Sequence, residues 1–121
     1  MKVLIADDSE LMRKRLITLI SGLEGIDVIE EAEDCGETIK IIRELNPDVV
    51  ILDIRMPGGS GMDILHQIKK KKTGPTVIIF TNYPYPEYRK KCMELGASFF
   101  FDKSTEFKKI SEVLKQLIEE Y

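Results

Sequence analysis

The sequence predicts an α/β fold in which a five-stranded parallel sheet carries helices on both faces. Short apolar runs alternate with amphipathic segments five times along the 121 residues. Apolar runs without polar alternation are typical of strands that are covered on both faces. Strand and helix pairs with short connections favour right-handed crossovers, and therefore a parallel sheet between two layers of helices.

Each apolar run is an expected strand. The run at 49–52, Val-Val-Ile-Leu, is continuous, whereas the segment at 27–32 is less apolar and is expected at the sheet edge. Gly74 and Pro75 turn the chain into the fourth run. The five expected strands are 3–6, 27–32, 49–52, 77–80 and 98–101.

Local start and stop signals define the expected helices. Ser9 and Ser60 can each cap a helix, and Asp34 with Glu37 three residues later resembles a capping box. Pro86 suits the first position of a helix. The stop signals are Gly22 with Gly25, Asn46 with Pro47, and Gly96. The last helix has one apolar stripe made of Phe107, Ile110, Val113, Leu114, Leu117 and Ile118.

Composition indicates one domain, residues 1–121, in the cytoplasm. A net charge of -3 and a sequence pI near 5.3 argue against direct nucleic-acid binding. The only basic run, Lys69–Lys72, is expected to be a solvated helix end. Cys35 and Cys92 are expected to be reduced thiols, because their spacing fits no redox pair or metal cluster. We expect no membrane span and no signal peptide, since no apolar stretch is long enough and a strand begins at once.

Asp53 follows the continuous apolar run at 49–52 and precedes a loop rich in glycine and proline, residues 57–61. In an open parallel sheet, ligands bind outside the carboxyl ends of the strands. In the common strand order 2-1-3-4-5, the ends that carry Asp7-Asp8, Asp53, Thr81 and Lys103 would lie at one edge. The stretch around Asp53 is therefore the candidate site around which the chain is organised.

The chemistry of this residue set favours phosphoryl transfer. Crowded carboxylates stay ionised only beside a cation, and a hard ion such as Mg²⁺ prefers oxygen ligands. Asp53 could then act as a nucleophile toward a phosphoryl group and form an aspartyl phosphate. Lys103 and the Thr81 hydroxyl could stabilise the transferred oxygens.

The chain resembles the receiver domain of two-component response regulators over essentially its whole length. The resemblance is carried by the order and spacing of several residues taken together. The matching residues are Asp7, Asp8, Asp53, Met56-Pro57, Gly61, Thr81, Gly96-Ala97 and Lys103. The resemblance extends to the single-domain chemotaxis regulator. It implies a flavodoxin-like, doubly wound fold with strand order 2-1-3-4-5.

The resemblance also implies a role for each residue. Asp53 would accept phosphate from a histidine kinase or phosphotransfer protein, and Thr81 and Lys103 would contact the phosphoryl group. The implied Mg²⁺ ligands are Asp8 directly, Asp7 through water, Asp53 and the Arg55 main-chain carbonyl. Phe100 would be the aromatic switch residue beside Thr81. The domain would assist its own phosphotransfer and dephosphorylation without being an enzyme in the usual sense.

Signalling would pass to an output domain or partner protein, possible outputs including transcription regulation. The expected contact surface is formed by the fourth helix, fifth strand and fifth helix, and the phosphorylated domain could pair with a second copy. His66, the only histidine, has no recognisable base partner and is given no role.

Each residue also has a simpler structural explanation when it is considered alone. The acidic pair can favour a helix N-terminus, and Thr81 can merely end a strand. Lys103 can extend over the sheet edge, and Phe100 can be a core residue. Only the combination of residues favours the site.

Three other classes of protein remain as alternatives. A phosphatase with an aspartyl nucleophile would commonly carry a second acid two positions on, where this chain has Arg55. A flavin carrier would need a phosphate cradle after the first strand, where Asp7-Asp8 would repel phosphate. A receiver-like interaction module that works without phosphorylation keeps the fold, but the complete acidic pocket argues against it.

Overall fold

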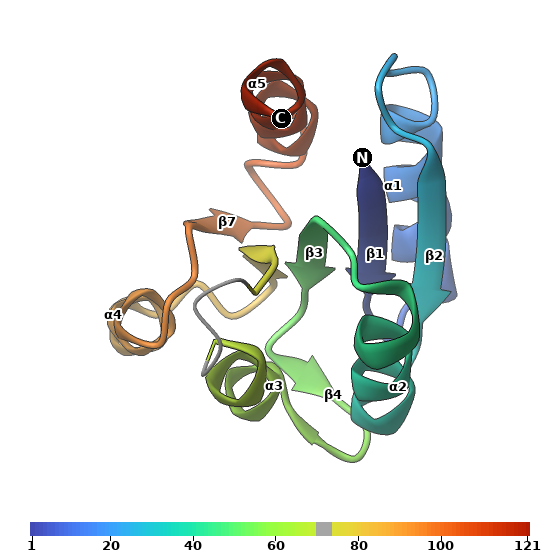
Figure 1. The fold of residues 1–121 in the computed structure, drawn as a ribbon. Helices are drawn as coiled ribbons and strands as arrows, with labels where there is room; N and C mark the ends of the chain where they lie inside the picture. Colours follow the sequence, from blue (N-terminus) through green and yellow to red (C-terminus); the bar gives the residue numbers. More distant parts are fainter. Residues whose placement is uncertain (70–73) are drawn as a thin grey trace.

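The computed structural model describes residues 1–69 and 74–121 and has the expected α/β fold (Figure 1). Its main sheet has five parallel strands in the order β2-β1-β3-β6-β7, which is the predicted order 2-1-3-4-5. These strands are β1 Lys2–Ala6, β2 Val28–Ala32, β3 Val49–Leu52, β6 Thr76–Thr81 and β7 Phe99–Asp102. The helices are α1 Glu10–Ile20, α2 Cys35–Leu45, α3 Gly61–Ile68, α4 Pro86–Glu94 and α5 Lys109–Glu120.

Two helical layers cover the sheet, with α1 and α5 on one face and α2, α3 and α4 on the other (Figure 1). Alternate residues of β1 face the two layers: Val3 and Ile5 join the core cluster under α1 and α5, whereas Leu4 and Ala6 join the other. Each fully buried large aliphatic side chain contributes roughly 1.5–3 kcal/mol of transfer free energy. Burial on both faces explains why the strand sequences are continuously apolar.

The predicted local signals at the helix ends are confirmed. The side chains of Ser9, Asp34 and Ser60 each accept a hydrogen bond from a backbone N–H two or three residues further on. Pro86 is the first residue of α4, and Asn46 ends α2 in the left-handed region at φ 51°. The capping side chains of Ser9, Asp34 and Ser60 thus pair backbone N–H groups that a helix start leaves without an intrahelical partner.

Three expectations differ from the structure in detail. The glycine-rich loop after Asp53 contains a short antiparallel hairpin, formed by β4 Arg55–Met56 and β5 Gly59–Ser60. The fifth strand of the main sheet begins one residue later than 98–101 and includes Asp102, because Asp102 pairs with the last residue of β6. Phe107 precedes α5, and its ring packs against the Phe80 ring at a centroid distance of 6.2 Å.

Three further expectations concern the basic run, membrane spans and the two cysteines. Of the basic run Lys69–Lys72, only Lys69 lies within the described residues, and its ammonium donates to the Pro75 carbonyl at 3.1 Å. None of the described helices is both long enough and apolar enough to span a bilayer. Cys35 and Cys92 are both unpaired and buried, as expected of reduced thiols.

Candidate functional site

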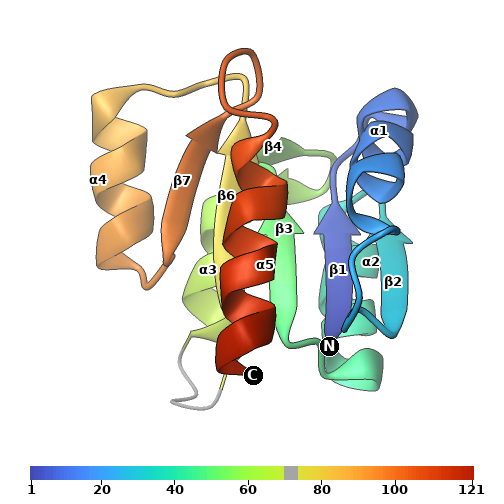
Figure 2. The same ribbon diagram turned by 90° about the horizontal axis from the view of Figure 1, so that it is seen from above.

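The carboxyl ends of β1, β2, β3 and β7 lie toward the same edge of the sheet (Figure 2). Asp7 and Asp53 directly follow β1 and β3, and each backbone N–H bonds the last carbonyl of the neighbouring strand at 3.0 Å. The Lys103 N–H bonds the Thr81 carbonyl at 3.0 Å, so β7 is anchored to β6 at the same level. The sheet register thus brings four of the predicted site residues to one edge.

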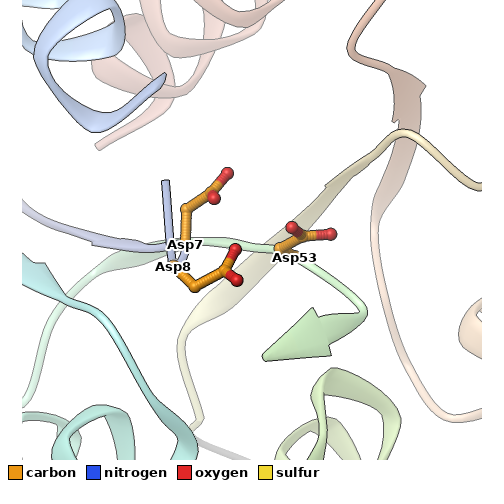
Figure 3. Close-up of side chains that lie close together, drawn as sticks. All are labelled: Asp7, Asp8 and Asp53. Atoms are coloured by element: carbon orange, nitrogen blue, oxygen red, sulfur yellow. The ribbon is translucent and has the colours of Figure 1, made fainter. Parts of the chain in front are cut away.

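Three carboxylates meet at this edge. One oxygen from each of Asp7, Asp8 and Asp53 lies within 4.8 Å of the others. Figure 3 shows Asp7 and Asp8 leaving the same turn, with Asp53 beside them at the end of β3. Asp7 and Asp53 are buried and Asp8 is exposed, so the cluster has one side open to solvent.

Lys103 supplies the positive charge inside this cluster. Its ammonium lies 2.8 Å from Asp53 Oδ2 and 2.5 Å from Asp7 Oδ2. Burial by itself would lower the Lys103 pKa, but attraction to Asp53 and Asp7 outweighs burial and the pKa is raised. Lys103 is therefore held in its charged form between two buried carboxylates.

Asp53 is held through only one of its two carboxylate oxygens. Its Oδ1 is buried and accepts no hydrogen bond from the described part of the chain. Burial raises the Asp53 pKa more than the hydrogen bond from Lys103 lowers it, and the nearby Asp7 adds to the increase. An unpaired buried oxygen is costly, so Oδ1 is a candidate ligand for a metal ion.

Thr81 is completely buried at the end of β6. Its hydroxyl oxygen accepts a hydrogen bond from the Tyr83 backbone N–H at 3.0 Å. Because this bond uses an oxygen lone pair, it leaves the hydroxyl hydrogen available for an acceptor.

Arg55 lies in β4, two residues after Asp53, with its side chain exposed. The guanidinium carbon lies 3.9 Å from the centre of the Tyr83 ring, so the side chain leans toward the β6–α4 connection. The backbone of this segment is tightly packed: a Cβ added at Gly61 would lie 2.1 Å from the Asp53 carbonyl oxygen. Only glycine fits where α3 begins against the Asp53 peptide.

Phe100 belongs to the hydrophobic core under α2, α3 and α4. It is only 4% exposed, so its ring is already turned inward in this structure. The Arg89 guanidinium lies 5.7 Å from the Phe100 ring centre and also donates to the Phe100 carbonyl at 3.2 Å. His66 is exposed on α3, in agreement with the surface position expected for it.

One residue near the site was missed by sequence reasoning. Arg13 is buried, and its Nη1 donates to the Asp7 main-chain oxygen at 2.6 Å. Its spacing from Leu16 and Ile20, also buried on α1, was the available signal. A charged residue within an apolar helical stripe indicates a buried partner.

The donor set fits a hard divalent cation. Three carboxylates reach one small volume, and Asp53 Oδ1 has no partner in the described part of the chain. Magnesium and calcium prefer such oxygen ligands, and an acidic cluster with one open side can also admit water. The residues at this edge are therefore consistent with a metal site.

Comparison with known proteins agrees with this geometry. Residues 3–115 match the response regulator receiver domain family. The chain is 30% identical over 117 residues to response regulator GacA and 34% identical over 117 residues to the positive alginate biosynthesis regulatory protein, both of Pseudomonas aeruginosa. These matches cover 96% of this chain but 54% and 46% of the two relatives, so the chain spans about half their length.

The fold is likewise similar to solved structures. A LuxR-family DNA-binding response regulator from Staphylococcus aureus superposes with a TM-score of 0.87 at 29% identity. That superposition covers 97% of this chain and 98% of the other. The acidic edge, the buried lysine and these matches lead to one conclusion: the chain belongs to the response regulator receiver domain family.

Proposed function

We propose that residues 1–121 form one receiver domain that acts in the cytoplasm as a phosphorylation-activated switch. Asp53 accepts a phosphoryl group from a histidine kinase or phosphotransfer protein. The observation that carries this proposal is Asp53 Oδ1, which is buried beside Lys103 and two further carboxylates and has no hydrogen-bond partner among the described residues. The domain works as a signalling module that assists its own phosphotransfer and dephosphorylation.

Asp53 provides the nucleophile in this scheme. Lys103 holds Oδ2, which orients the carboxylate and leaves Oδ1 free to attack phosphorus. A new P–O bond forms on Asp53 while the P–N bond of the donor phosphohistidine breaks, and the donor imidazole takes up a proton. The product is an aspartyl phosphate at the open edge of the sheet.

Mg²⁺ is the proposed cofactor. Asp8 would hold it directly, Asp7 through water, and Asp53 and the Arg55 main-chain carbonyl would complete the protein ligands. When bound, Mg²⁺ offsets the negative charges of the carboxylates and of the incoming phosphoryl group. Asp8 is the exposed member of the cluster, so it is the ligand that solvent and ions reach first.

Lys103 and Thr81 stabilise the phosphoryl oxygens. The Lys103 ammonium already lies between Asp7 and Asp53, within reach of a group attached to Asp53. The hydroxyl hydrogen of Thr81 is available to a phosphoryl oxygen because the Thr81 oxygen serves as an acceptor for Tyr83. Such preorganised donors stabilise charge that develops during phosphoryl transfer.

Labelling with a small acyl-phosphate donor tests the proposal. We expect one phosphoryl group per chain, dependent on Mg²⁺, and none in Asp53→Asn. Asp63→Asn is the matched control, because Asp63 is an exposed carboxylate on α3. Mg²⁺ titration of Asp8→Ala should show strongly weakened binding, since a hard ion loses a charged ligand.

Two outcomes contradict the proposal. Undiminished labelling of Asp53→Asn would place the phosphoryl group elsewhere. Absence of both labelling and Mg²⁺ binding in the unsubstituted chain would favour the alternative, a receiver-like interaction module that works without phosphorylation.

The proposed output surface is formed by α4, β7 and α5. Exposed basic residues mark this face, namely Arg89, Lys90, Lys108 and Lys109. Movement of the Thr81 hydroxyl toward a phosphoryl oxygen would alter the space between Asp53 and Phe100. Arg89 supports this route, because it joins α4 to both the ring and the carbonyl of Phe100. The partner that binds the proposed output surface would be an output domain, a separate protein or a second copy of the chain. Transcription regulation is one possible output.

Backbone amide shifts recorded with and without a stable phosphoryl mimic test this route. We expect changes to extend from the Asp53 site to α4 and α5, and to stop near the site in Thr81→Ala. Since the Phe100 ring is already buried, the response should involve its neighbours on α4 more than a large ring rotation. Equal changes in Thr81→Ala would exclude the route through Thr81.

A further inference from the structure

Arg13 occupies a position that the proposed phosphotransfer chemistry does not use. It lies in the second turn of α1, and the Arg13 side chain is 10% exposed while that of the next residue, Lys14, is 58% exposed. A buried guanidinium is costly unless all its charge is matched by partners. The contacts of Arg13 therefore show what this position is built to hold.

Arg13 joins three elements at the acidic edge. Nη1 donates to the Asp7 main-chain oxygen at 2.6 Å, in a buried hydrogen bond. Nε donates at 3.0 Å to Oε1 of Glu31, which lies on β2. The guanidinium thus connects the first turns of α1 to the end of β1 and to β2, and the planar fork of arginine suits two acceptors at fixed directions.

The Asp7 main-chain oxygen lies in the peptide that links Asp7 to Asp8. A hydrogen bond to this oxygen fixes the orientation of that peptide, and with it the directions in which the two carboxylates leave the turn. The Ser9 N–H donates to Asp7 Oδ1 at 2.9 Å and fixes the same turn from its other side. The positive charge of Arg13 also makes its hydrogen bond to the Asp7 main-chain oxygen a charge-assisted one, which is stronger than a bond between neutral groups.

We propose that Arg13 is a positioning residue for the divalent cation: it orients the Asp7-Asp8 peptide and so sets the affinity of the acidic cluster for Mg²⁺. Glu31 in turn orients Arg13. This inference rests on the proposed Mg²⁺-dependent function of the same site. Residues that orient metal ligands through hydrogen bonds, without contacting the metal themselves, typically contribute about 10- to 100-fold to metal affinity.

Lys14 provides a matched control. Its ammonium donates at 3.0 Å to Oε2, the other oxygen of Glu31, but it is exposed. Lys14→Met therefore removes one positive charge and one Glu31 partner next to Arg13 without removing the hydrogen bond to Asp7. A difference between Arg13→Met and Lys14→Met isolates that hydrogen bond and the buried charge.

The experiment measures Mg²⁺ affinity by calorimetric titration and stability by urea unfolding in EDTA, on the full chain. We expect Arg13→Met to weaken Mg²⁺ binding about tenfold, and Lys14→Met to stay within about twofold of the unsubstituted chain. Acyl-phosphate labelling should need about tenfold more Mg²⁺ for half-saturation in Arg13→Met. The labelling rate at saturating Mg²⁺ should be nearly unchanged.

Arg13→Lys keeps the test decisive if Arg13→Met does not fold. The single ammonium of lysine cannot donate from both the Nε and the Nη1 position of arginine. We therefore expect Arg13→Lys to bind Mg²⁺ more weakly than Lys14→Met does. Unchanged Mg²⁺ affinity in a folded Arg13 variant, with only its stability reduced, would overturn the inference and leave Arg13 a structural residue. Failure of the unsubstituted chain to bind Mg²⁺ would instead overturn the proposed function itself.

Discussion

Asp7 and Asp53 are two buried aspartates at the ends of neighbouring strands, yet they are held very differently. Every polar atom of Asp7 has a partner. Its N–H donates to the last carbonyl of β2, and its carbonyl accepts from Arg13. Its carboxylate accepts from the Ser9 N–H and pairs with the Lys103 ammonium. The carboxylate of Asp53 has one strong partner, Lys103, and its Oδ1 accepts no hydrogen bond from residues 1–69 or 74–121. Asp7 is thus fixed through both of its carboxylate oxygens, whereas Asp53 is fixed through one and is the proposed reactive group.

The largest effect on stability is expected from removing the Lys103 ammonium, which the two aspartates share. Lys103→Met leaves both carboxylates buried without a counter-charge, so the free energy of unfolding should fall by about 3 kcal/mol at neutral pH. Mg²⁺ should restore part of this loss, because it binds the folded state selectively. Urea unfolding in EDTA and in Mg²⁺ measures both effects. Lys115→Met, an exposed change on α5, is the control, and an equal loss there would contradict the expectation.

Disturbing the backbone on the Asp53 side should have the next largest effect. In Gly61→Ala the new Cβ would meet the Asp53 carbonyl oxygen, and the strand end or α3 must shift. We expect a loss of about 2 kcal/mol in unfolding free energy and slower acyl-phosphate labelling. Gly22→Ala is the control, because a Cβ there meets no atom within 4 Å. Labelling and stability that match this control would show that the Asp53 backbone tolerates displacement.

Amide substitutions test the difference between the two aspartates directly. Asp7→Asn should cost about 1–2 kcal/mol, since an amide cannot satisfy both the Lys103 ammonium and the Ser9 N–H as the carboxylate does. Asp53→Asn should instead raise the unfolding free energy at neutral pH, because the amide removes a carboxylate charge whose burial disfavours the folded state. Urea unfolding of both variants at pH 7 checks the opposite signs, and equal losses would remove the contrast.

The gain from Asp53→Asn should depend on pH. The Asp53 pKa is raised above its ordinary value of 3.8 by burial, so ionisation of Asp53 disfavours the folded state. Stability of the unsubstituted chain is lost as pH rises from 3.8 through the raised folded pKa. The difference between Asp53→Asn and the unsubstituted chain should therefore vanish below about pH 3.8. A gain that persists at low pH would show that the cause is not charge burial.

The smallest effect is expected at Glu106, a carboxylate whose two oxygens are both paired. It accepts from the Lys109 ammonium at 2.7 Å and from the Asp102 N–H at 3.1 Å, and these bonds lower its pKa from 4.5. Stability from a lowered carboxylate pKa is present above 4.5 and is lost as pH falls through the folded value. Glu106→Gln should cost about 0.5 kcal/mol at pH 7 and nothing at low pH, as measured by urea unfolding. A loss that is independent of pH would contradict the electrostatic cause.

Local sequence determined much of this protein, because the relevant interactions span only a few residues. Apolar runs predicted the strands, and Ser9, Asp34, Ser60 and Pro86 marked helix starts that the structure confirms. The polar residues that follow the apolar runs could be named as site candidates, since a strand end is visible in the sequence.

Strand order was harder to predict from the sequence. It depends on the side of the sheet to which each strand–helix–strand connection returns and not on local periodicity. The order was predicted from the family resemblance, and the register then brought Asp7, Asp53, Thr81 and Lys103 to one edge. The hairpin of β4 and β5 was missed, since each of its strands has two residues and too short a pattern to detect.

Only the tertiary structure decided how each charged group is paired. Sequence spacing put Arg13 on the same stripe as Leu16, but it could not show that the guanidinium reaches back to Asp7 and across to Glu31. Nor could it show that Lys103 bonds one oxygen of Asp53 while the other has no partner in the part of the chain that the structure describes. These pairings join residues up to 50 positions apart, so they exist only when packing has set the distances between strands.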